Sequence, residues 1–183
     1  AFGTYRITDE TPQHIQALIE AIDSGVTLID TSSNYMDGGA ERAIALALRN
    51  FDEDKRDSIE IVSKFGYIHG SNLIAHKEEA FEDVVMFSDD CYHSISTSFM
   101  KDQLFKSLSR LEQTKIDCYL VHNPEYFLLD ALKRKKDIDE ALDTMYDRIF
   151  DVFVGLEEQV KAGTVGSYGI SSNSFAKENT DVE

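Results

Sequence analysis

Residues 25–30 read Gly-Val-Thr-Leu-Ile-Asp, a glycine and a short apolar run that stops at a carboxylate. A β-branched apolar run of this length predicts a buried strand. Before it, the Thr11 hydroxyl is predicted to cap a helix that starts at Pro12, and apolar residues then recur at helical spacing as far as Ile22. Gly25 separates the two patterns. The stretch therefore predicts a helix that leads directly into a strand.

The same unit of helix and strand recurs along the chain. Phe2-Gly3-Thr4 is interpreted as the first strand, and further strands are predicted at 59–63, 116–121 and 165–170. Helices are predicted at 40–48, 100–111 and 139–162. Residues 67–97 are predicted to be an irregular segment that is mostly a surface insertion, although some of it could line a substrate pocket. Nearly continuous apolar strands that alternate with helices indicate an α/β fold with a parallel sheet covered by helices.

Polar side chains stand where four of these strands end. They are Asp30, Lys64, His122 and Ser171. Each alone has a structural interpretation, such as a helix cap, a surface lysine or a turn. A doubly wound sheet would favour a Gly-rich GxGxxG turn, which is missing. In a (β/α)8 TIM barrel the carboxyl ends of all strands converge on one face, where active sites form. The combination therefore favours the barrel and a site at that face.

The composition narrows the classes of partner. The net charge of −16 argues against a nucleic-acid partner, and no apolar run approaches the ~20 residues that a membrane span needs. Cys91 and Cys118 have no metal-binding or disulfide-scaffold spacing, which favours a reducing, cytoplasmic location. His69, His76 and His93 have no compact ligand spacing either, so no metal site is predicted.

Five blocks of the chain have a distinctive sequence. The first runs from Gly25 to Tyr35, with Gly39 and Glu41 soon after. The others are 61–66 (Ile-Val-Ser-Lys-Phe-Gly), 107–111 (Ser-Leu-Ser-Arg-Leu), 116–124 (Ile-Asp-Cys-Tyr-Leu-Val-His-Asn-Pro) and 163–173 (Gly-Thr-Val-Gly-Ser-Tyr-Gly-Ile-Ser-Ser-Asn). These blocks resemble those of the aldo-keto reductase family. They come in the family's order and cover nearly the whole chain.

The resemblance implies an oxidoreductase that moves hydride between a nicotinamide cofactor and a carbonyl or alcohol. The family's catalytic tetrad matches Asp30, Tyr35, Lys64 and His122. Tyr35 would be the general acid, and His122 would orient the substrate oxygen. Since a free phenol has a pKa of about 10, we expect the Lys64 ammonium to lower the pKa of Tyr35. Asp30 would keep Lys64 charged and in position.

The resemblance also implies the cofactor and the substrate class. NADP(H) is the expected cofactor, with NAD(H) as the alternative, and the substrate would be an aldehyde, a ketone or a sugar. Gly3, Thr4, Tyr5 and Asp30 would face the nicotinamide and its ribose. Ser171 would hold the carboxamide together with either Ser172 or Asn173, because the chain departs here from the common Ser-Asn pair.

Two other functions remain open from the sequence. A metal-dependent hydrolase on a similar barrel would also place Asp and His at strand ends, although Lys64 and Tyr35 would then have no role. A non-catalytic, cofactor-binding regulatory subunit would keep the same residues. Residues 1–183 are interpreted as one barrel domain that is incomplete at its C-terminus. Five βα units are present, whereas a closed barrel needs roughly 250 residues, so we expect further chain to carry the adenosine side of the cofactor site.

Overall fold

The computed structural model describes residues 1–78 and 80–174, and its centre is a parallel sheet. The strands lie in the order β1-β2-β3-β7-β8, each parallel to its neighbours. Their bounds are β1 Phe2–Gly3, β2 Leu28–Asp30, β3 Glu60–Phe65, β7 Ile116–His122 and β8 Val165–Ser171. Each predicted strand is present, and the sheet order follows the chain order. The arrangement is that of five consecutive βα units of a (β/α)8 barrel, as the sequence predicts.

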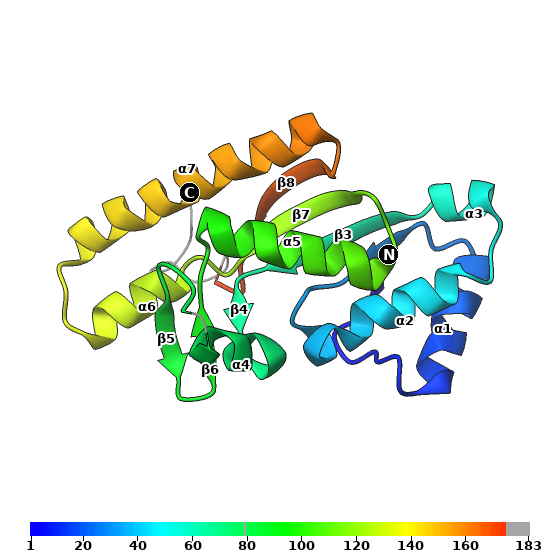
Figure 1. Ribbon diagram of the computed structural model, residues 1–183, viewed down its shortest axis with the longest axis horizontal. Helices are drawn as coiled ribbons and strands as arrows, with labels where there is room; N and C mark the ends of the chain where they lie inside the picture. The colour runs from blue at the N-terminus through cyan, green and yellow to red at the C-terminus, as the bar shows by residue number, and fades with distance from the viewer. Residues whose placement is uncertain (79, 175–183) are drawn as a thin grey trace.

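Helices connect successive strands and cover the sheet on its outer side (Figure 1). The long ones are α1 Pro12–Asp23, α2 Gly39–Leu48, α5 Thr97–Leu111 and α7 Ile138–Ala162; the short ones are η1 Tyr35–Gly38, α3 Glu53–Asp57 and α6 Tyr126–Lys133. The apolar stripe of α7 is buried at Met145, Ile149 and Leu156 as its spacing predicts. One detail was predicted wrongly. Thr11 precedes α1, but its hydroxyl makes no capping hydrogen bond.

The main core lies between these helices and the sheet. Its largest fully buried side chains include Leu18, Ile44, Phe65, Phe99 and Tyr119, and the rings of Phe65 and Tyr119 stack at 5.1 Å. These residues come from α1, α2, β3, α5 and β7. The core therefore ties neighbouring βα units together and holds the strand ends in place, which matters because the candidate site is built on those ends.

The prediction of an irregular segment at 67–97 is wrong. The segment forms β4 Tyr67–Ile68, α4 Gly70–Glu78, β5 Val85–Ser88 and β6 Cys91–His93, and the three strands make an antiparallel sheet in the order β4-β6-β5. We call it the small sheet. Strands of two to four residues are too short to show an alternating pattern, so pairing with one another rather than local pattern defines them.

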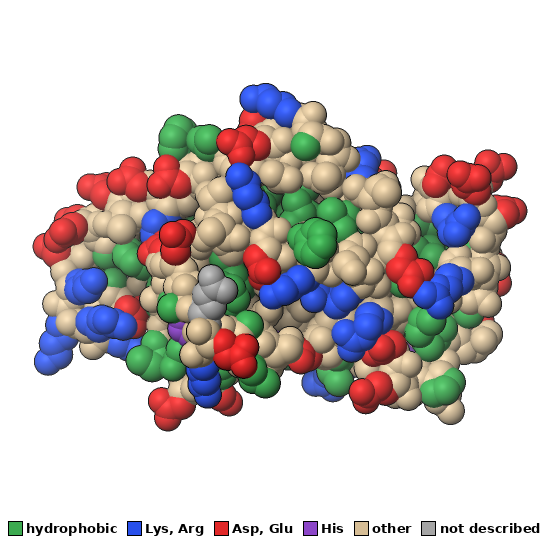
Figure 2. Space-filling model, in the orientation of Figure 1, with side chains coloured by type: hydrophobic (Ala, Val, Ile, Leu, Met, Phe, Trp, Pro, Cys, Tyr) green, Lys and Arg blue, Asp and Glu red, His purple; other side chains and the backbone are tan. Residues whose placement is uncertain are grey.

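The acidic character of the chain is visible on its surface. Figure 2 shows acidic side chains gathered over α3 and over the part of α7 that follows α6, with lysine and arginine side chains between them. No helix in the described ranges, 1–78 and 80–174, is both long enough and apolar enough to span a bilayer.

Candidate active site

Asp30 and Lys64 form an ion pair where β2 and β3 end. The Lys64 Nζ donates to Asp30 Oδ1 at 2.7 Å and to the Thr31 carbonyl oxygen at 2.7 Å. Lys64 is only 4% exposed. A buried ammonium is stable only when it is paired and hydrogen-bonded. The Asp30 carboxylate therefore pairs with Lys64 and fixes its position, and the sequence predicts this pairing.

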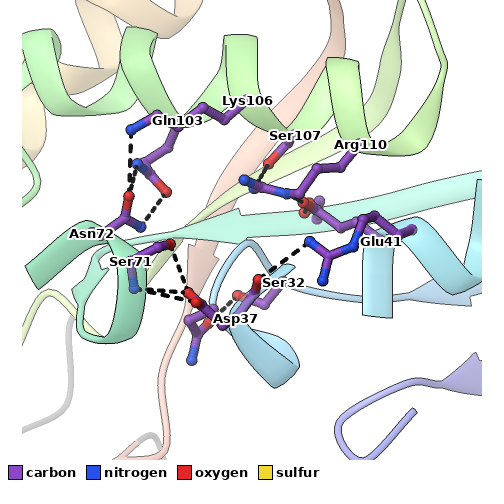
Figure 3. A network of polar contacts seen from close by, with 12 residues as sticks. Ser32, Asp37, Glu41, Ser71, Asn72, Gln103, Lys106, Ser107 and Arg110 are labelled. Atoms are coloured by element: carbon purple, nitrogen blue, oxygen red, sulfur yellow. Dashed lines mark hydrogen bonds and ion pairs between the residues drawn. The ribbon is translucent and has the colours of Figure 1, made fainter. Parts of the chain in front are cut away.

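Tyr35 reaches this ion pair from the turn after β2. Its hydroxyl oxygen lies 3.5 Å from Lys64 Nζ, at the limit of a hydrogen bond. The next two residues, Met36 and Asp37, have φ values of 51° and 52°, which L-residues adopt only when contacts impose them. The Asp37 carboxylate supplies such contacts: it accepts hydrogen bonds from the Ser71 amide at 3.2 Å and from the Ser71 hydroxyl at 2.8 Å (Figure 3). The start of α4 thus anchors the turn that carries Tyr35.

The expected effect of Lys64 on Tyr35 is not found. Burial, and then the negative charge of Asp30, raise the pKa of Tyr35 to about 12. The Lys64 ammonium makes its shortest hydrogen bonds to Asp30 and to the Thr31 carbonyl oxygen, at 2.7 Å, whereas the phenol oxygen of Tyr35 is 3.5 Å away. The phenol therefore keeps its proton through the neutral range, which is the state that a proton donor requires.

His122 stands at the end of β7 and is 7% exposed. Its Nδ1 lies 3.3 Å from the Ser32 hydroxyl oxygen. Its ring packs against the rings of Tyr67 and Tyr35, with centroid separations of 4.9 and 6.3 Å. Burial, the Lys64 charge and His93 lower the pKa of His122 to about 3. The imidazole is therefore neutral near pH 7, with one ring nitrogen protonated.

These residues meet at a cavity of about 550 Å³. It is lined by Tyr5, Asn34, Tyr35, Tyr67, His69, Cys91, His122, Tyr126 and Asn173. The structure therefore brings the four expected residues together: Tyr35 and His122 line the cavity, and the ion pair of Asp30 and Lys64 lies behind Tyr35. A cavity of this size with a mostly aromatic wall and a few polar groups is typical of small-molecule sites.

The cavity wall opposite Tyr35 and His122 contains residues that the sequence did not single out as site residues. Tyr67 and Cys91 come from the small sheet and Tyr126 comes from α6. Tyr67 directly follows the Lys64-Phe65-Gly66 motif, which was the one available signal for it. Of the histidines noted in 67–97, His69 lines the cavity, His76 packs on Phe81, and His93 is buried behind it.

The three expected cofactor residues near the N-terminus differ in what they can reach. Gly3 pairs with Asp30 across the sheet. Thr4 is fully buried, and its hydroxyl donates to the Asp30 carbonyl oxygen at 2.9 Å, so it supports the strand end. Tyr5 is 65% exposed, lines the cavity and packs its ring against Tyr35 at 5.2 Å. Of the three, Tyr5 has the side chain that faces the cavity.

The residues at the end of β8 and after it also differ in whether they can reach the cavity. Ser171 pairs with His122 at the strand end. The Ser172 hydroxyl donates to Glu125 Oε1 at 2.7 Å, whereas Asn173 is exposed and lines the cavity. The Asn173 amide nitrogen donates to Asn123 Oδ1 at 2.8 Å, which anchors its backbone. Asn173 is thus the better placed of the two to contact a ligand.

The sequence matches the model of one known protein family. The model of the aldo/keto reductase family covers residues 1–181. The chain belongs to the aldo/keto reductase family. Among curated proteins it is similar to the uncharacterized oxidoreductase YqkF of Bacillus subtilis, with 25% identity over 170 residues. The match covers 93% of this chain and 43% of YqkF, so the chain spans less than half the length of that relative.

Solved structures agree on the fold. The aldo-keto reductase AKR11C1 from Bacillus halodurans, in its holo form, superposes with a TM-score of 0.65 at 24% identity and covers 100% of this chain and 50% of its own. An aldo/keto reductase from Klebsiella pneumoniae in complex with NADP and acetate has a TM-score of 0.55 at 24% identity, covering 93% and 44%. At this identity the likeness establishes the shared barrel architecture.

Side chains from three of the blocks that resemble the aldo/keto reductase family form a buried network (Figure 3). The Glu41 carboxylate, on α2, is fully buried and accepts hydrogen bonds from the Ser63 hydroxyl and from Arg110 Nε, both at 2.7 Å. Arg110, on α5, also donates to the Ser107 hydroxyl at 3.3 Å. Ser63 directly precedes Lys64, so this network supports the strand that carries the ion pair.

No group of three or more His, Cys, Asp or Glu side chains within residues 1–78 and 80–174 is placed to hold a metal ion. Among the four residues expected from the sequence, Asp30 and Lys64 form an ion pair, the Tyr35 phenol is protonated and the His122 imidazole is neutral.

Acid should destabilise the protein through His122 and His93. Their pKa values fall from 6.5 in the unfolded chain to about 3 and about 4 in the folded state. The unfolded state therefore binds more protons below pH 6.5, and the free energy of unfolding falls as the pH drops from 6.5 towards 4. Each histidine contributes up to about 1.4 kcal/mol per pH unit.

Urea unfolding of the wild type and of His122→Gln at pH 7, 6 and 5 measures this effect. The variant should lose less stability per pH unit, because one of the two titrating groups is gone. Equal pH slopes in the two proteins would mean that His122 is not held neutral by the fold.

Proposed function

We propose that the protein is an oxidoreductase that interconverts a carbonyl and an alcohol with NADP(H). The observation that carries this proposal is the chain of contacts from Asp30 to Lys64 to Tyr35, next to a neutral His122 on the same cavity. An ion pair used only for stability would not need a protonated phenol aimed into a cavity. The bound nicotinamide would supply or take up the hydride.

Tyr35 acts as the general acid in this proposal. When hydride reaches the carbonyl carbon, the oxygen becomes an alkoxide unless a proton arrives with it. An alkoxide is a much stronger base than a phenolate, even where the pKa of Tyr35 is about 12, so the Tyr35 proton moves to the developing oxyanion. The Lys64 ammonium, 3.5 Å from the phenol oxygen, then stabilises the phenolate that forms.

His122 and the cavity wall position the substrate. A neutral imidazole donates one hydrogen bond, which would orient the carbonyl oxygen towards Tyr35. The described wall of the cavity carries Tyr5, Tyr67 and Tyr126, whose rings suit the flat or C–H-rich faces of small aldehydes, ketones and sugars. These substrates are the class that we propose.

The residues present fit the nicotinamide end of the cofactor. A planar, polar ring needs a flat apolar surface and groups that can pair with its carboxamide. Tyr5 supplies the first, while the Asn173 side chain and the Ser171 strand end supply the second. A cavity of about 550 Å³ has room for that ring and a small substrate together. We propose NADP(H) as the cofactor, with NAD(H) as the alternative, and a cytoplasmic location that agrees with the free cysteines Cys91 and Cys118.

Cofactor oxidation by the full-length protein tests the function. NADPH and NADH are each mixed with a panel of aldehydes, ketones and sugars, and the nicotinamide absorbance is followed under multiple- and single-turnover conditions. We expect turnover with at least one carbonyl class and faster turnover with NADPH. Cofactor binding without even a single turnover across the panel would contradict the enzyme and favour the non-catalytic, cofactor-binding subunit.

A further inference from the structure

The carbonyl oxygen of His122 is held by a side chain from the small sheet. The ladder between β3 and β7 ends at the pair Phe65 and Val121, one residue before His122. On that side, His93 Nε2 lies 2.7 Å from the His122 carbonyl oxygen. Because a carbonyl oxygen can only accept, Nε2 must carry the proton and donate it. The His93 side chain therefore takes the place of a backbone donor at the point where β3 turns away.

This contact requires a glycine at position 66. Gly66 has a φ of 152°, and a Cβ there would lie 2.6 Å from His93 Nε2 and 2.7 Å from the His122 carbonyl oxygen. His93 is 1% exposed. The Tyr67 ring packs edge-on against both imidazoles, with centroid separations of 5.6 Å to His93 and 4.9 Å to His122. The two histidines and Tyr67 are thus packed with little room to move.

A second contact from the small sheet holds the next residue, Asn123. Asn123 has a φ of 52°, and its side-chain Nδ2 donates to the Tyr67 hydroxyl at 2.6 Å. The chain therefore leaves the sheet directly after His122 through a left-handed residue, a conformation that asparagine adopts more readily than most other residues. The contacts from His93 and from Tyr67 thus hold the two consecutive residues His122 and Asn123 at the end of β7, and both contacts come from the small sheet.

The protonation state of His93 suits a side chain that always donates this hydrogen bond. Burial lowers its pKa to about 4, so its ring is neutral near pH 7 and has a single N–H. That N–H donates to the His122 carbonyl oxygen. The His93 ring faces the His122 peptide and the rings of Tyr67 and Tyr126. The positive charge of Arg148 also favours the neutral form of His93.

We propose that His93 is a positioning residue for His122: by holding the His122 carbonyl oxygen, it sets the direction in which the imidazole enters the cavity. This role rests on the proposed reduction, in which His122 orients the substrate oxygen. Small misplacements of such a group cost up to about 10²-fold in rate. This contact from His93 would give the small sheet a role at the proposed active site.

Two variants separate the effect of losing the hydrogen-bond donor of His93 from the effect of changing its packing. His93→Leu removes the N–H and keeps an apolar side chain of similar size, whereas His93→Gln keeps an N–H near the position of Nε2. We expect His93→Leu to lower kcat for carbonyl reduction about 10- to 100-fold, with a smaller change in the Kd for NADPH, and His93→Gln to restore much of that loss. His76→Leu is the matched control, because His76 lies in the same segment, accepts from the Phe81 amide at 3.0 Å, and does not contact His122.

A second measurement does not depend on turnover. In full-length protein labelled with ¹⁵N-histidine, the His122 ring signals are assigned by their loss in His122→Gln. They should shift or broaden in His93→Leu, return towards wild type in His93→Gln, and stay unchanged in His76→Leu. Wild-type protein without turnover on any carbonyl would refute the proposed function, and the ring signals would still test the positioning. The positioning role is wrong if His93→Leu leaves the His122 signals at their wild-type positions, or if it slows an active enzyme no more than His76→Leu does.

Discussion

Tyr35→Phe is expected to lower the rate of carbonyl reduction by about 10²- to 10⁴-fold, the usual contribution of a general acid. The substitution removes one oxygen, which lies 3.5 Å from Lys64 Nζ, and keeps the ring that packs between Tyr5 and His122. The affinity for NADPH should change little, because the phenol acts on the substrate oxygen. Steady-state kinetics and cofactor titration of the full-length variant measure the two effects separately.

Tyr5→Phe is the matched control for this experiment. Tyr5 lines the same cavity and contacts Tyr35 through its ring, but it is 65% exposed and has no part in the ion pair. We expect it to keep most of the activity. If Tyr35→Phe turned over as fast as Tyr5→Phe, another group would have to supply the proton, and the proposed role of Tyr35 would be wrong.

The largest expected effect on stability comes from Arg110→Met. Glu41 is fully buried, and its two oxygens accept from Ser63 and Arg110. Loss of the guanidinium leaves a buried carboxylate with one neutral donor, which typically costs about 3–5 kcal/mol. The cost should appear in the free energy of unfolding measured with urea. Since Ser63 precedes Lys64 on β3, we also expect some loss of activity under conditions where the variant is folded.

A surface ion pair provides the control. Arg49 pairs with Glu112, and both side chains are about half exposed, so Arg49→Met should change the stability little. In Arg110→Met, a second substitution, Glu41→Gln, removes the unpaired charge and should recover part of the loss. A cost for Arg110→Met no greater than for Arg49→Met would contradict the buried pair as a stabilising element of the site.

Much of the fold follows from local sequence. The apolar runs at 26–29 and 116–121 are long enough to specify strands, and the helical spacing in 139–162 specifies a helix. Because parallel strands place their carboxyl ends at one edge, the positions of Asp30, Lys64 and His122 at strand ends already predicted their convergence. In the structure Tyr35 and His122 line one cavity, and the ion pair of Asp30 and Lys64 lies next to Tyr35.

Other features depend on contacts between distant segments. The strands of the small sheet are too short to have a pattern of their own, so only their pairing defines the wall that Tyr67 and Cys91 contribute. Whether Ser172 or Asn173 faces the cavity depends on Glu125, which engages the Ser172 hydroxyl from 47 residues away.

The protonation of Tyr35 shows the same division. The resemblance to the family, which places Lys64 beside Tyr35, led to the prediction that Lys64 would lower the pKa of the phenol. Instead burial and the Asp30 carboxylate raise it, because the pKa depends on the distance to every neighbouring charge and on the loss of water, and both are set by folding. The sequence by itself determined which groups meet at the strand ends. The tertiary structure decided their protonation states, the wall opposite them, and the hydrogen bond from His93 that holds His122.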